Sequence, residues 1–260
     1  MNHIDLNCDM GEMPEHISDG TQEALMRSIT SVNIACGGHA GDAQTMATTI
    51  QQALGYKLAI GAHPGYADRA NFGRIELNLS HEEVADSIYE QVRALAQVAA
   101  RYHANISHIK PHGALYNQAV QNSQLARAIA SGVARWSQEV VLVGLAGSPM
   151  LDVFRQAGFP IFAEAFADRR YEPDGTLRSR KHSDALIQDP AEAARQALSI
   201  VQGKVIARDG SEVPLHADTL CIHSDTPGSA QIAAQVAKNL RESGVMLVHA
   251  LPPIKKKRAH

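Results

Sequence analysis

Short apolar runs that end in polar clusters recur along this chain and most strongly constrain its fold. Each run has the length of a buried strand, and most are followed by a stretch with the helical spacing of apolar residues. The runs centre on residues 4–9, 32–36, 58–62, 106–110, 140–145, 161–166 and 220–223. Seven such units in 260 residues predict a single TIM-like (β/α)7 barrel of the α/β class. The loops that follow its strands would share one face, where the polar clusters converge.

Capping signals mark several of the intervening helices. A Ser or Asp before the first apolar residue accepts hydrogen bonds from the free N–H groups of the first turn, and proline fits the first helical position. The expected caps are Asp42, Ser80 with Glu83, Ser148 before Pro149, and Asp189 before Pro190. Helices are expected to end at Gly55 and, for the last one, near 228–243 before Gly244.

The final third of the chain departs from this alternation. Residues 203–216, around Asp209-Gly210, have the pattern of a small inserted β-hairpin. A weaker apolar run at 245–248 is a candidate eighth strand. We expect one domain over residues 1–250 and a basic, solvated and disordered tail over residues 251–260.

Composition excludes several classes of function. The formal net charge of −3 provides no basic field for nucleic acid, and no apolar run approaches the roughly 20 residues that span a bilayer. The chain starts in a strand rather than a signal peptide, and Cys8, Cys36 and Cys221 show no CxxC spacing. A cytoplasmic protein with reduced, half-buried thiols is expected. No Walker A, G-x-G-x-x-G or H-E-x-x-H motif is present in this chain.

The first strand carries alternating polar residues. Asp5, Asn7 and Asp9 point to one face, which in a barrel is the interior, and Glu12 follows just beyond. Unpaired carboxylates in an interior are costly, so these residues form either a structural hydrogen-bond network or a functional pocket. We favour the pocket, in which a carboxylate serves as general base or metal ligand.

Two histidines follow the next strands. His39 lies after a Gly-Gly pair that allows close backbone approach to a ligand, and His63 lies at the end of the third strand. His63 could instead be hydrogen-bonded at the rim of the core. If the pocket holds a metal, His39, His63 and Asp9 are the candidate ligands.

Lys110 ends the fourth strand, and a buried ammonium requires a partner. The partner could be a substrate carboxylate, a developing oxyanion, or an ion pair with Asp9 or Glu164. Arg74 and Arg169 could clamp an anionic substrate, with surface salt bridges as the alternative.

His223 and Asp225 flank Ser224 at the end of the last main strand. Because they are two positions apart, we expect the carboxylate to orient the imidazole for acid–base work. No G-x-S-x-G elbow surrounds Ser224, which disfavours a serine hydrolase.

Together, these polar segments resemble the lactam-utilisation (LamB/YcsF) family, the A subunits of 5-oxoprolinase. The resemblance spans roughly residues 2–245. The matching segments are Asn7-x-Asp9-x-Gly11-Glu12, Asn33-Ile34-Ala35-Cys36-Gly37-x-His39-Ala40-Gly41-Asp42, Gly61-Ala62-His63-Pro64-Gly65-Tyr66, Phe72-Gly73-Arg74, His108-x-Lys110-Pro111-His112-Gly113-Ala114-Leu115-Tyr116-Asn117, Phe166-Ala167-Asp168-Arg169-x-Tyr171 and Asp218-Thr219-Leu220-Cys221-x-His223-x-Asp225-Thr226-Pro227-Gly228.

The resemblance implies a barrel related to the polysaccharide deacetylase architecture. It also implies ATP-dependent opening of 5-oxo-L-proline to L-glutamate, with Mg²⁺ accompanying the ATP and with partner subunits B and C. We expect catalysis from Asp9, Lys110, His112, His223 and Asp225. We expect substrate contacts from Asn7, Glu12, Asn33, His39, His63, Arg74, Tyr116, Asn117 and Glu164.

The chain departs from the family pattern beside the expected pocket. Residues 13–20 are shorter and rearranged, Gly38 stands where Phe is usual, and Ser224 stands where Gly is usual. Two alternatives therefore stay open. One is a metal-dependent amide or acetyl-sugar hydrolase that acts without ATP, and the other is a lactam-binding carrier that hands its ligand to partners.

Overall fold

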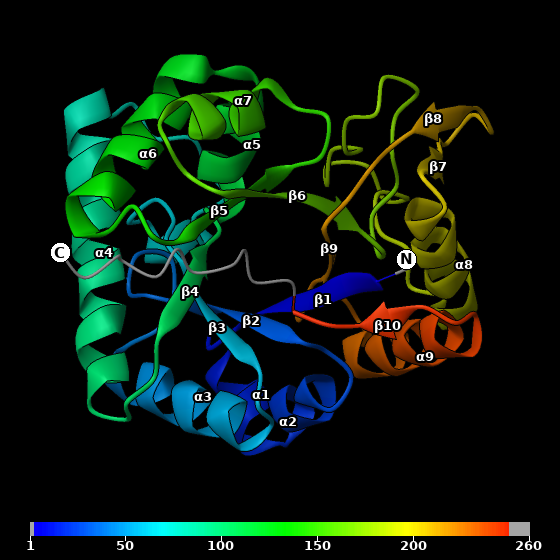
Figure 1. The fold of residues 1–260 in the computed structure, drawn as a ribbon, viewed down its shortest axis with the longest axis horizontal. Helices are drawn as coiled ribbons and strands as arrows, with labels where there is room; N and C mark the ends of the chain where they lie inside the picture. Colours follow the sequence, from blue (N-terminus) through cyan, green and yellow to red (C-terminus); the bar gives the residue numbers. More distant parts are fainter. Residues whose placement is uncertain (1–2, 250–260) are drawn as a thin grey trace, which may run out of the picture.

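A closed barrel of parallel strands forms the centre of the computed structural model, which describes residues 3–249 (Figure 1). The first strand pairs with the second on one side and with the ninth on the other, which closes the sheet. The predicted seven-stranded barrel is therefore confirmed. Its strands are β1 (His3–Met10), β2 (Ser31–Ala35), β3 (Ala59–His63), β4 (Ile106–Ile109), β5 (Val141–Leu145), β6 (Ile161–Phe166) and β9 (Thr219–Ile222).

Helices connect these strands and lie around them (Figure 1). They bury their apolar stripes against the outside of the barrel, as Val84, Ile88 and Leu95 do from the longest helix. The helices are α1 (Pro14–Ser18), α2 (Thr21–Met26), α3 (Ala43–Gly55), α4 (His81–Ala100), α5 (Gly113–Gln121), α6 (Ser123–Trp136), α7 (Pro149–Gln156), α8 (Pro190–Val201) and α9 (Ser229–Glu242).

The predicted caps are confirmed with one exception. Asp42, Ser80 and Asp189 each accept hydrogen bonds from first-turn N–H groups of α3, α4 and α8. Ser148 precedes α7 as predicted, but its hydroxyl donates to the carbonyl of Leu145 at 2.7 Å instead of capping the helix. A serine hydroxyl can both donate and accept, and here the strand-end carbonyl of Leu145 accepts from both the hydroxyl and the backbone N–H of Ser148.

The inserted hairpin is confirmed as β7 (Lys204–Ile206) and β8 (Glu212–Pro214), which pair in antiparallel fashion. The candidate eighth strand is only the two-residue β10 (Met246–Leu247), which pairs with the start of β1 outside the closed barrel. The basic tail predicted over 251–260 lies outside the described residues. Within residues 3–249, no helix combines the length and apolar character that a bilayer crossing requires.

The barrel interior is unusually polar. In the amino-terminal half of β1, Asp5 accepts hydrogen bonds from Ser31 and from Thr219. Asn7 donates to Glu164 at 3.1 Å. Although burial acts to raise the pKa of Asp5, His249 and the hydroxyls of Thr219 and Thr30 more than compensate and lower it. The interpretation as a structural hydrogen-bond network therefore applies to Asp5 and Asn7. Asp9 lies nearer the carboxyl end of β1, where the cavity described below opens.

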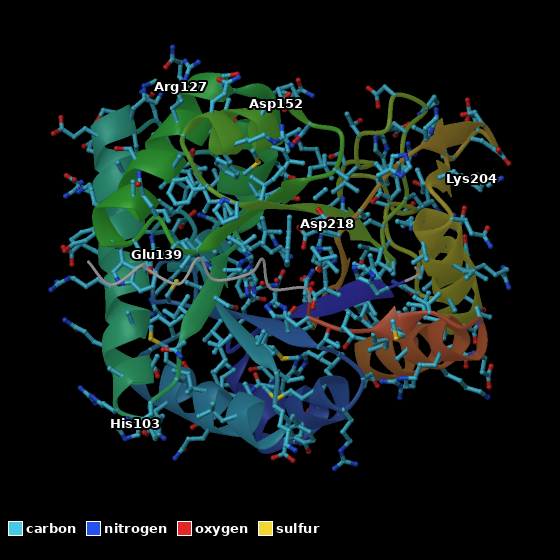
Figure 2. The ribbon with its side chains drawn as sticks, in the orientation of Figure 1. His103, Arg127, Glu139, Asp152, Lys204 and Asp218 are labelled. Atoms are coloured by element: carbon cyan, nitrogen blue, oxygen red, sulfur yellow. The ribbon has the colours of Figure 1, made fainter. Side chains whose placement is uncertain are left out.

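Charged residues on the outer helices lie where solvent can hydrate them. Figure 2 places Arg127 of α6 and Asp152 of α7 at the periphery of the helical layer, and both are exposed. Charges buried inside the barrel lose this hydration, which costs free energy unless specific partners compensate for it.

Gly61 of β3 leaves room for a buried histidine, so its replacement should destabilise the barrel. A Cβ at this position would lie 2.2 Å from Nε2 of His108, which also contacts Asn33 at 2.9 Å. Gly61→Ala should cost about 1–3 kcal/mol of unfolding free energy through overpacking. In thermal unfolding, the melting temperature should fall by about 2–4 °C for each kcal/mol of stability that is lost. Gly55→Ala is the matched control, because no atom lies within 4 Å of its added Cβ; equal melting temperatures for the two variants would contradict this account.

Candidate active site

A cavity of about 490 Å³ opens at the carboxyl ends of the barrel strands. All five residues expected to be catalytic line it, and so do five of those expected to contact substrate. These ten are Asp9, Glu12, His63, Arg74, Lys110, His112, Tyr116, Asn117, His223 and Asp225. The other four expected substrate contacts, Asn7, Asn33, His39 and Glu164, lie behind this lining and support it through hydrogen bonds. Parallel-barrel geometry thus brings distant segments to one site as predicted.

Lys110 is the buried charge at the base of the cavity. Its Nζ lies 3.0 Å from Oδ1 of Asp9 and 2.8 Å from Oε1 of Glu164. Burial acts to lower the pKa of Lys110, but the two carboxylates more than compensate and raise it well above its ordinary value. The pKa of Asp9 falls well below its usual range, because His63 and Lys110 outweigh the opposing effect of burial. This site therefore contains a permanent ammonium beside an ionised aspartate.

Cys221 adds a sulfur to this group. Its Sγ lies 3.1 Å from Nζ of Lys110, and burial raises the pKa of the thiol well above its ordinary value. All three cysteines are free and buried. A thiol that stays protonated is a poor nucleophile, so Cys221 packs and polarises rather than attacks.

Glu12 forms the centre of a histidine cluster on one wall of the cavity. Its Oε1 lies 2.9 Å from Nε2 of His39, 3.2 Å from Nδ1 of His112 and 3.7 Å from Nε2 of His63. Despite burial, the close His112 and His39 side chains lower the pKa of Glu12. Burial lowers the pKa of His39 to about 4. The metal-ligand candidates of the sequence are thus regrouped, because Glu12 and His112 join His39 and His63, while Asp9 pairs with Lys110 and lies 3.4 Å from Nε2 of His63.

His223 is oriented by Asp168, not by Asp225 as the sequence suggested. Its Nδ1 lies 2.9 Å from Asp168, which also accepts from the backbone N–H of His223 and the hydroxyl of Thr226. The strand β9 ends at Ile222, so the alternation of side chains does not extend to Asp225. Asp168 is the partner that the sequence interpretation missed, although its position directly after β6 is the same strand-end signal that identifies the others.

Asp225 instead joins two arginines. It contacts Arg74 and lies 2.8 Å from Nη1 of Arg180. Although burial acts to raise the pKa of Asp225, His223 and Arg180 outweigh it and hold that pKa at about 2. Arg180 lies on the irregular segment between β6 and α8, which carries no periodic pattern from which its role could be predicted.

Arg169 is buried, in contrast to the surface salt bridge offered as the alternative for it. Its side chain donates to the carbonyl of Arg178 at 2.7 Å, while its buried Nε has no hydrogen-bond partner. Across residues 3–249 it forms no salt bridge with a carboxylate. Burial and the nearby Arg180 lower its pKa to about 10. Arg169 therefore lines the cavity as a cation whose anionic partner the described residues do not supply.

Gly38 lies against the side chain of Gln91 in α4. A Cβ on Gly38 would lie 2.2 Å from Oε1 of Gln91, so the amide of Gln91 occupies the space that a side chain at position 38 would need. Gln91 also donates to the carbonyl of Gly65 at 2.8 Å and accepts from its N–H at 3.1 Å. It therefore braces the loop that follows His63.

Known proteins are similar in sequence to this chain over nearly its whole length. The A subunit of the 5-oxoprolinase from Chloroflexus aggregans is 48% identical over 243 residues, which cover 93% of this chain and 96% of that protein. The corresponding 5-oxoprolinase protein of Methylococcus capsulatus is 45% identical over 243 residues, which cover 93% and 94%.

Solved structures share the fold. The lactam utilization protein from Thermus thermophilus superposes with a TM-score of 0.88 at 38% identity and covers 95% of this chain and 99% of its own. A variant of the peptidoglycan deacetylase PdaC from Bacillus subtilis superposes with a TM-score of 0.51 at 13% identity over 99% and 93%. This second likeness concerns the fold alone and confirms the expected deacetylase-like architecture. The model of the LamB/YcsF family matches residues 4–255, and the chain belongs to that family.

Proposed function

We propose that this chain is the A subunit of a 5-oxoprolinase and opens 5-oxo-L-proline to L-glutamate with ATP and partner subunits B and C. The observation that carries the proposal is the buried group of Lys110, Asp9 and Glu164 at the base of the cavity. Charges held in a water-poor site stabilise developing charge more strongly than charges in water. The names of the relatives from Chloroflexus and Methylococcus support the choice of substrate.

Arg169 is the proposed anchor for the substrate carboxylate. 5-Oxoproline carries one carboxylate beside its cyclic amide, and the guanidinium of Arg169 has a buried Nε without a partner. Arginine binds carboxylates through paired N–H donors. Arg74, the other arginine that the sequence suggested as a clamp, is half exposed and already pairs with Asp225, so it acts at the rim.

Lys110 is the proposed donor to the lactam oxygen, and His223 is the proposed base. A general base works best when its pKa lies near the working pH, and the depressed pKa of Asp9 makes that carboxylate a weak base. His223, held by Asp168, is left as the group that accepts a proton from water and returns it to the leaving nitrogen. Asp9 keeps Lys110 charged and in place.

ATP would supply the activation that an unstrained amide needs. Transfer of its terminal phosphoryl group to the lactam oxygen makes the ring carbonyl carbon electrophilic. Water then adds at that carbon, the C–N bond breaks to give glutamyl phosphate, and a second water releases glutamate and phosphate. This chain has no Walker A motif, so we propose that ATP and its Mg²⁺ bind together with subunits B and C.

Glutamate release tests the proposal. We expect turnover of 5-oxoproline only when this chain, subunits B and C, Mg²⁺ and ATP are all present. Arg127→Ala, on the exposed face of α6, should keep full activity, whereas Arg169→Lys should raise the KM for 5-oxoproline. Turnover by this chain without ATP would instead identify a metal-dependent amide hydrolase. Tight lactam binding with activity unaffected by changes at Asp9, Lys110 and His223 would identify a carrier.

A further inference from the structure

We propose that Glu12, His63 and His112 form a binding site for one divalent transition-metal ion, open toward the cavity. The geometry of this cluster carries the proposal, independently of the proposed lactam chemistry. All three residues are buried and line the cavity, so an ion held by them would face a bound small molecule.

The backbone sets the tautomer of His63. Its Nδ1 lies 2.8 Å from the carbonyl oxygen of Lys110, and a carbonyl can only accept, so Nδ1 carries the hydrogen. The lone pair of the neutral ring is therefore on Nε2, which points into the cluster. Metal-binding histidines usually donate one ring N–H to a backbone carbonyl or carboxylate and bind the metal through the other ring nitrogen.

His112 is fixed in the same way but through its opposite nitrogen. Its Nε2 lies 2.9 Å from the carbonyl oxygen of Phe72, so the lone pair is on Nδ1. This Nδ1 lies only 2.9 Å from Nε2 of His63. Two neutral rings held in these tautomers would direct lone pairs at each other across that distance. A cation between them removes the repulsion.

Glu12 completes a set with metal-like spacing. Its Oε1 lies 3.2 Å from Nδ1 of His112 and 3.7 Å from Nε2 of His63. Ligands on a tetrahedron with metal–ligand bonds of about 2.0–2.1 Å lie about 3.3 Å apart. The three distances among the proposed ligands, from 2.9 to 3.7 Å, bracket that value. Three protein ligands leave a fourth position for water or a substrate oxygen.

His39 acts behind the proposed site as a positioning residue. Its Nε2 lies 2.9 Å from Oε1 of Glu12, and its ring stacks on that of His112 with 3.6 Å between centroids. It does not line the cavity. A donated hydrogen bond from Nε2 would hold the Glu12 carboxylate in the orientation that the ion needs.

A second group of potential ligands, Asp9, Cys221 and His223, is a poorer site. Nζ of Lys110 already lies 3.0 Å from Asp9 and 3.1 Å from Cys221, so a permanent cation fills that position. The donor set of two imidazoles and one carboxylate at the Glu12 cluster suits Zn²⁺, Mn²⁺, Co²⁺ or Ni²⁺ better than Mg²⁺ or Ca²⁺, which prefer oxygen ligands.

Metal titration of the full chain tests the site. The protein is treated with a chelator, dialysed and titrated with Co²⁺ and with Zn²⁺, each alone. We expect about one ion per chain, a visible Co²⁺ spectrum typical of low coordination number, and a higher melting temperature with Zn²⁺. Wild-type protein that binds neither ion would overturn the proposal and would identify a shared proton as the occupant of the cluster.

Variants locate the ion. Glu12→Gln and His63→Gln should lose the Co²⁺ spectrum and the Zn²⁺-dependent rise in melting temperature, while His39→Gln should weaken binding by about 10–100-fold. His223→Asn is the matched control, since it removes an imidazole from the other cluster and should leave metal binding unchanged. Folding is checked in each variant by circular dichroism without metal. Loss of binding in His223→Asn with retention in Glu12→Gln would place the ion at the other cluster and refute the proposal.

Discussion

Replacement of Lys110 by methionine is expected to abolish turnover and to destabilise the barrel by about 3–5 kcal/mol. The side chain of Lys110 is the only described positive group within salt-bridge distance of Glu164, and it lies 3.0 Å from Asp9. Without the ammonium, the buried Glu164 carboxylate would have no cationic partner among the described residues, and Asp9 would keep only His63, 3.4 Å away. Chemical denaturation would measure the loss of stability, and glutamate release by the complete assembly would measure the loss of activity.

A second substitution separates the two effects. In Lys110→Met with Glu164→Gln, the Glu164 charge is removed as well, so much of the lost stability should return. Activity should stay absent, because the proposed donor to the lactam oxygen is still missing. If the double variant were as unstable as Lys110→Met, or if either variant turned over normally, the role assigned to Lys110 would be wrong.

Asp168→Asn is expected to lower kcat by about 10²–10⁴-fold, the range associated with loss of general acid–base catalysis. Asp168 accepts hydrogen bonds from both Nδ1 and the backbone N–H of His223. An asparagine can present one oxygen but places an N–H group where the second acceptor was, so the ring turns or changes tautomer. Steady-state kinetics should show the fall in kcat with little change in the KM for 5-oxoproline.

Thr226→Val provides the comparison for Asp168. It removes one hydrogen bond to the same carboxylate, at 2.8 Å, and leaves the contact with His223 in place. We expect a modest loss of stability and a near-normal pH profile of kcat, in contrast to a displaced profile for Asp168→Asn. Equal effects of the two substitutions would show that Asp168 serves only to hold the loop after β9.

The fold can be predicted from the sequence because its signals are local. Apolar runs of strand length, caps such as Asp42 and Ser80, and prolines at first helical positions each depend on a few neighbouring residues. Residues 11–30 are harder, because α1 and α2 are too short to show a helical stripe. The two-residue β10 is shorter than predicted because an apolar run does not show how many of its residues find a partner.

The site can be predicted only as far as strand ends determine it. Residues at the ends of β1, β3, β4 and β9 are found from the sequence because barrel topology places all such ends together. Which of these side chains then hydrogen-bond or pair with one another depends on the geometry of the loops beyond the strand ends. For that reason the sequence assigns His223 to Asp225 rather than Asp168, and it gives no sign of Arg180 on a segment without periodicity.

The contact between Gly38 and Gln91 has a consequence for how either position can be changed. The amide of Gln91 fills the volume beside Gly38 and holds Gly65 near the cavity, so the two positions share one space although 53 residues separate them. A bulky residue at position 38 and a glutamine at position 91 in its present position exclude each other sterically. Any larger side chain introduced at position 38 would therefore require a change at position 91 as well, so the two positions can be altered only together.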